Sequence, residues 1–134
     1  MIDDFKAQVL NFRELLKNYA EAELTDPNYS KRIISAQELL NMKPYKPTED
    51  AMQVCESYLQ SLSDENQAYL MCAMYCGRSL LEGDQWKRSE IQTVESIADA
   101  LYIDTDDAAE TIMGKRGSAL LEYFNEFCRF AYGK

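Results

Sequence analysis

Hydrophobic residues recur every three or four positions along most of the chain, and this spacing gives an α-helix one apolar face. In the first such segment, residues 3–24, the apolar positions are Phe5, Val9, Phe12, Leu16 and Tyr19. No segment alternates polar and apolar residues over a useful length with the two-residue period of a half-buried strand. The pattern therefore predicts an all-α fold.

Residues that end or begin helices divide this pattern into six or seven predicted helices. Pro27 ends the first, because the residue before a proline is disfavoured in helical geometry, and Gly83 and Gly114 end two later ones. Short polar side chains, which are typical of helix N-termini, mark the expected starts of the others at Ser30, Thr48, Ser63, Ser89, Thr105 and Ser118. The helix from Ser63 is apolar on much of its circumference, so we expect it to be the central, most buried element. The helices are predicted to pack as a single compact bundle, one domain over residues 1–134.

The composition narrows the chemistry that the chain can perform. Its 134 residues include no histidine, which excludes Ser-His-Asp triads, histidine general bases and histidine-ligated zinc. The longest run without charged or amide side chains, residues 68–77, is far shorter than the roughly 20 residues of a membrane-spanning helix. The first residues lack the basic and apolar regions of a signal peptide. We therefore predict a soluble, cytoplasmic protein that does not interact with membranes.

Charge is distributed unevenly along the chain, whose net charge is −9. Residues 47–114 carry 14 acidic and three basic side chains, whereas residues 1–46 are neutral and residues 115–134 are net positive. An acidic segment of this kind repels nucleic acid phosphates, so direct DNA or RNA binding is not expected. Two interpretations stay open: a solvated face that keeps the protein soluble, or a docking face for a basic partner.

Cysteines and carboxylates are the remaining candidates for metal binding or catalysis. The four cysteines lie in apolar helical patterns without a Cys-x-x-Cys motif, which favours core packing over a zinc site. The Glu-x-x-Glu spacing with which helical pyrophosphate hydrolases hold magnesium is absent, and capping and solvation account for the other carboxylate pairs. No phosphate-binding loop, dinucleotide fingerprint or nucleophile elbow occurs. We predict no cofactor and no metal site.

One turn combines residue types that are enriched at protein interfaces. Arg78 follows the most apolar predicted helix, and Asp84 and Trp86, the only tryptophan, lie just beyond it. Tryptophan and arginine are over-represented at binding hot spots. A purely structural explanation is also open, in which Arg78 pairs with Glu82 or Asp84 and Trp86 packs against the start of the fifth predicted helix.

The same region resembles a small bacterial family known only as a domain of unknown function. The resemblance is carried by residues 62–71 (LSDENQAYLM), 74–78 (MYCGR), 83–86 (GDQW), 112–114 (IMG) and 120–124 (LLEYF). It covers about residues 52–130, and it departs from the family where residues 79–82 separate Gly-Arg from Gly-Asp. The resemblance implies a bacterial, helical, cytoplasmic protein and no activity.

We predict from these features a non-enzymatic module for protein–protein interaction or regulation. Its partner is expected to be a protein, of basic character if the acidic region forms the docking face. The candidate interaction residues are Arg78, Asp84, Trp86, Glu95, Asp99, Asp106 and Glu110. Homodimerisation through the aromatic C-terminal helix is a further prediction, based on Tyr123, Phe124, Phe127, Phe130 and Tyr132.

Two alternative functions belong to other classes. The first is a carboxylate-based, Mg²⁺-dependent enzyme that acts on a small phosphorylated substrate. The second is an acidic inhibitor or immunity-type protein of a toxin or a nucleic-acid enzyme. The second differs from a general interaction module only in the identity of the partner.

Overall fold

A computed structural model describes residues 1–29 and 35–134, with all of their side chains except that of Leu39. Within these residues the chain forms seven α-helices, two short 3-10 helices and no β-strand, which confirms the predicted all-α fold. The elements in chain order are η1 (Ile2–Phe5), α1 (Lys6–Thr25), α2 (Ala36–Asn41), α3 (Lys46–Ser61), α4 (Asp64–Leu81), η2 (Arg88–Ile91), α5 (Val94–Leu101), α6 (Ala108–Met113) and α7 (Gly117–Tyr132). None of these described helices is both long and apolar enough to cross a membrane.

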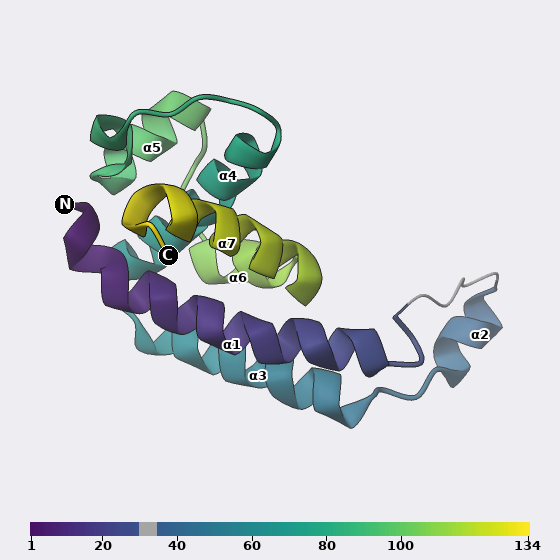
Figure 1. The fold of residues 1–134 in the computed structure, drawn as a ribbon. Helices are drawn as coiled ribbons and strands as arrows, with labels where there is room; N and C mark the ends of the chain where they lie inside the picture. Colours follow the sequence, from purple (N-terminus) through teal and green to yellow (C-terminus); the bar gives the residue numbers. More distant parts are fainter. Residues whose placement is uncertain (30–34) are drawn as a thin grey trace.

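The centre of the fold is formed by α4 and α7, which pack against each other. One side of α7 also contacts α1, which runs alongside α3, while α5 and α6 pack against α4 (Figure 1). Ten residues of α4 are buried, so the prediction that this helix is the central element is confirmed. Aromatic rings connect the N-terminal elements to the two central helices. Phe5 of η1 stacks on Tyr69 of α4 with centroids 3.9 Å apart, and Phe12 of α1 meets Phe124 of α7 edge-on at 5.2 Å. These contacts bury the apolar stripes that the sequence pattern revealed.

Two glycines allow helices to approach closely at the centre. A Cβ atom on Gly77 of α4 would lie 2.0 Å from the backbone carbonyl oxygen of Tyr123 in α7. A Cβ atom on Gly117, the first residue of α7, would lie 2.7 Å from the ring of Tyr19 in α1. The absence of side chains at these positions therefore sets the distances between α7 and its two main neighbours.

Several helix ends differ from the sequence-based prediction. α3 begins at Lys46 rather than Thr48, because Pro47 fits the first turn of a helix. The predicted helix over residues 89–102 is divided into η2 and α5, and α5 begins after Thr93, whose hydroxyl accepts the Ser96 N–H. α6 begins at Ala108 rather than Thr105. The predicted cap Ser30 lies outside the described residues.

The N-terminus of α7 is capped by a residue from α1. The buried Glu23 carboxylate accepts the backbone N–H groups of Gly117 and Ser118, each at 2.9 Å. A carboxylate at this position is stabilised by the partial positive charge of the helix N-terminus. The prediction that Ser118 begins this helix was therefore off by one residue, and the capping side chain is Glu23.

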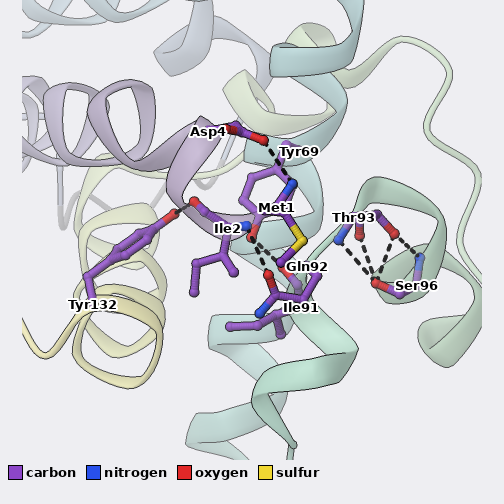
Figure 2. A network of polar contacts seen from close by, with 9 residues as sticks. All are labelled: Met1, Ile2, Asp4, Tyr69, Ile91, Gln92, Thr93, Ser96 and Tyr132. Carbon is purple, nitrogen blue, oxygen red and sulfur yellow. Dashed lines mark hydrogen bonds and ion pairs between the residues drawn. The ribbon is translucent and has the colours of Figure 1, made fainter.

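The first residues of the chain are tied to two other segments, as Figure 2 shows. The Ile2 N–H donates to the side-chain oxygen of Gln92 (3.1 Å), and the Tyr132 hydroxyl donates to the Ile2 carbonyl (2.8 Å). The buried Tyr69 hydroxyl donates to the Ile91 carbonyl at 2.6 Å. These bonds fix η2, and with it the position of α5, against α4 and the end of α7.

Candidate functional site

A groove of about 960 Å³ lies between α3, the start of α4 and α6. The buried Ala68 and Ala108, together with the half-buried Met113, contribute apolar surface to it. Acidic side chains surround this surface, and among the described residues no lysine or arginine lines the groove. The five carboxylates are those of Glu56, Asp64, Asp106, Asp107 and Glu110. We call this feature the acidic groove.

The α3–α4 wall of the acidic groove is held by short-range hydrogen bonds. The Ser63 hydroxyl accepts the Asn66 N–H at 3.2 Å and caps α4, as the sequence predicts. The Gln67 side-chain amide donates to the carbonyls of Leu59 (2.7 Å) and Leu62 (3.2 Å), at the end of α3. The turn that carries Asp64 is thus fixed relative to α3.

The opposite wall is the loop that leads into α6. The Asp106 N–H donates to a carboxylate oxygen of Asp104 at 2.8 Å, which forms a tight turn. Asp107 has a left-handed backbone conformation (φ 54°), which aspartate tolerates better than most residues. This turn places Asp106, Asp107 and, one helical turn later, Glu110 along the same groove.

The carboxylates of the acidic groove have no counter-charge within the described part of the chain. None of the five forms an ion pair or a side-chain hydrogen bond there. Elsewhere carboxylates do find cations, as in the pairs Lys17–Glu14 and Lys46–Asp50. A hollow lined by charges of one sign concentrates its field and attracts oppositely charged groups. The acidic groove is therefore well suited to a cationic ligand.

The spacing of these carboxylates bears on the magnesium alternative. Among the described residues, no three Asp, Glu or Cys side chains lie close enough together to hold a metal ion. Magnesium requires several oxygen ligands at about 2.1 Å in near-octahedral geometry, and proteins supply some of them as converging carboxylates. Charges spread along a groove are better matched to a ligand whose positive charges are also spread out.

The structure brings together only some of the residues that the sequence singled out. Asp106 and Glu110 lie in the acidic groove, whereas Glu95 and Asp99 are exposed on α5 and do not line it. Sequence reasoning missed Glu56, Asp64 and Asp107. Their only sequence signal was membership of the acidic segment 47–114, which does not distinguish groove residues from the rest.

Arg78, Asp84 and Trp86 have partners within the chain. Arg78 donates to Glu82 at 3.2 Å, as the structural explanation of this turn proposes. The indole N–H of Trp86 donates to the Ser79 hydroxyl (2.9 Å), which donates to the Asp84 carboxylate (2.6 Å). These bonds hold the chain after α4. Arg78 and Asp84 also line a smaller hollow of about 200 Å³ between α4 and the end of α5.

The four cysteines, Cys55, Cys72, Cys76 and Cys128, are free and buried. Burial raises the thiol pKa from 9.0 to about 11 for Cys55 and Cys128, and to about 12 for Cys72 and Cys76. Because the thiolate is the nucleophilic form, we expect all four to resist iodoacetamide in the native protein at about pH 8 and to react once it is denatured. Intact-mass measurement counts the adducts, and labelling of the native protein would contradict the burial.

The aromatic residues of α7 are either buried or partly buried against the rest of the chain. Phe124 and Phe127 are fully buried, and Tyr123, Phe130 and Tyr132 pack against the hydrophobic core. The aromatic pattern that suggested a dimer is thus accounted for within one chain. Homodimerisation itself stays a prediction.

The chain matches no protein-family model, no curated protein and no solved structure. The resemblance to a bacterial domain of unknown function therefore stays a prediction.

Proposed function

We propose that this protein is a non-enzymatic interaction module that binds a basic segment of another protein in its acidic groove. The observation that carries the proposal is the set of five carboxylates that line one groove and have no counter-charge among the residues that the structure describes. Lysine and arginine side chains are the natural counter-charges for such a surface, and complementary charge accelerates association and favours basic partners over acidic ones.

The form of the acidic groove favours a polypeptide over other cations. Its apolar surface, which includes Ala68, Ala108 and Met113, offers contacts that a metal ion cannot use. An amphipathic basic helix presents apolar and cationic residues at the spacing of a helical turn, and grooves between helices commonly receive such ligands. A basic toxin or a basic nucleic-acid enzyme is one class of protein that would carry this segment.

Binding of a short amphipathic helical peptide of lysine, alanine and leucine tests the proposal. The groove variant Asp106→Asn/Glu110→Gln removes two carboxylates from the acidic groove, and the α5 variant Glu95→Gln/Asp99→Asn removes two exposed ones outside it. We expect the groove variant to bind the labelled peptide roughly five- to tenfold more weakly at low salt, since an exposed ion pair contributes up to about 1 kcal/mol. Fluorescence anisotropy measures the affinities.

The α5 variant is the matched control, because it changes the net charge by the same amount. We expect it to change the affinity by less than about twofold, since its charges are distant and screened. Equal losses in both variants would mean that the whole acidic surface attracts the peptide and that the acidic groove is not the site. Failure of the wild-type protein to bind the peptide at low salt would contradict the proposed function altogether.

A further inference from the structure

Tyr102 is the most exposed large hydrophobic side chain among the described residues, with 95% of its surface accessible. It follows α5 directly and has a left-handed backbone conformation, with φ 54° and ψ 45°. For a residue other than glycine this conformation is disfavoured, because the Cβ atom comes close to the backbone. The ring is almost fully accessible, so packing within the chain does little to offset this disfavoured geometry.

Tyr102 lies in the connection between α5 and α6, which contributes residues to the smaller hollow and to the acidic groove. Its neighbours Leu101 and Ile103 line the smaller hollow between α4 and α5, and Thr105 lines the acidic groove. Three residues of extended chain span at most about 11 Å, so the backbone of Tyr102 lies within that distance of a groove residue. A segment bound in the acidic groove can therefore reach the Tyr102 ring with a neighbouring side chain.

We infer that Tyr102 forms an arginine-binding subsite beside the acidic groove, in which a guanidinium group of the bound segment stacks on the exposed ring. This inference rests on the proposed function, because the remainder of the segment occupies the acidic groove. Asp104, which is exposed two residues along the chain from Tyr102, adds negative charge near the subsite. The acidic surroundings favour a cation, and the ring face favours a planar one.

A contact of this kind occurs elsewhere in the described part of the chain. The guanidinium carbon of Arg116 lies 5.0 Å from the centroid of the Tyr29 ring. Arginine stacks on aromatic faces more readily than lysine, because its guanidinium is planar and more weakly hydrated than an ammonium group. A preference for arginine over lysine is therefore the signature of the subsite, whereas the carboxylates of the acidic groove respond to either charge.

The test compares the affinities of two peptides for the protein: the lysine peptide, and a peptide of the same sequence in which every lysine is replaced by arginine. For the wild-type protein we expect the arginine peptide to bind about two- to fivefold more tightly, the effect of one exposed cation–π contact. In Tyr102→Gly the preference should disappear while the lysine peptide binds as before. In Tyr102→Phe, which keeps the ring and removes the hydroxyl, the preference should persist.

Two controls separate the subsite from folding and from the acidic groove. The thermal midpoint of Tyr102→Gly should equal or exceed that of the wild type, because glycine suits the left-handed conformation. Leu24→Ala, which trims an exposed side chain on α1, should leave the arginine preference intact. If Tyr102→Gly still prefers the arginine peptide, the proposed subsite is contradicted. The same holds if the wild type binds both peptides equally well. Either result leaves the proposed binding of a basic segment in the acidic groove intact. If neither peptide binds, the proposed function fails.

Discussion

Gly77→Ala is expected to lower the free energy of unfolding by at least about 3 kcal/mol. The added Cβ atom would lie 2.0 Å from the carbonyl oxygen of Tyr123 and 2.7 Å from the carbonyl carbon, which are backbone atoms of α7. Neither helix can move aside easily, because α4 and α7 are the two central helices of the core. Urea denaturation followed by circular dichroism measures the change.

Whether Gly77→Ala lowers or raises the free energy of unfolding tests how closely α4 and α7 approach each other. In an unobstructed helix, alanine is more favourable than glycine by about 1 kcal/mol, so a stable Gly77→Ala variant would contradict the close approach of α4 and α7. Gly114→Ala is the matched control, because its Cβ atom would come no nearer than 3.4 Å to Thr111. We expect that control to change the stability by less than about 1 kcal/mol.

Glu23→Ala is expected to cost about 2–4 kcal/mol of stability, for two reasons. It leaves the N–H groups of Gly117 and Ser118 without their acceptor, and the first of these hydrogen bonds is fully buried. It also removes a negative charge from the N-terminus of α7. Glu23→Gln keeps one acceptor oxygen and should lose roughly half as much.

The control for Glu23 is an exposed glutamate on the same helix. Glu21→Ala should change the free energy of unfolding by less than about 0.5 kcal/mol, since its side chain lies in solvent. Urea denaturation of the three variants measures the series. If Glu23→Ala were as stable as Glu21→Ala, the carboxylate would not cap α7.

Local sequence signals predicted most of the helices and some of their ends. Ser63 caps α4, and Gly83 follows its end in a left-handed conformation, as a helix-ending glycine does. The cap of α7 was not predictable in this way, because Glu23 precedes Gly117 by 94 residues. Only the packing of α1 against α7 brings that carboxylate to the helix. The residues that surround Gly117 in the sequence do not indicate this contact.

The candidate site was predictable in its charge but not in its shape. Asp106 and Glu110 were identified from the acidic segment, and so were Glu95 and Asp99, which lie outside the acidic groove. Asp106 and Glu110 line the groove because α6 packs against α3 and α4. This is a tertiary contact, which the spacing of acidic residues in the sequence does not indicate. Tyr102 gave no sequence signal, since an aromatic residue near a helix end is ordinary and only the structure reveals its exposure and left-handed backbone.

The central claim is that the acidic groove, rather than acidic surface in general, receives a basic segment. Two-dimensional nitrogen–proton NMR tests it most directly, by following every backbone amide while the unlabelled arginine peptide is added. We expect the largest saturable shifts to fall in residues 56–68 and 104–114, with Tyr102 at their border. Shifts spread evenly over all acidic segments, or centred on α1 and α7, would contradict it.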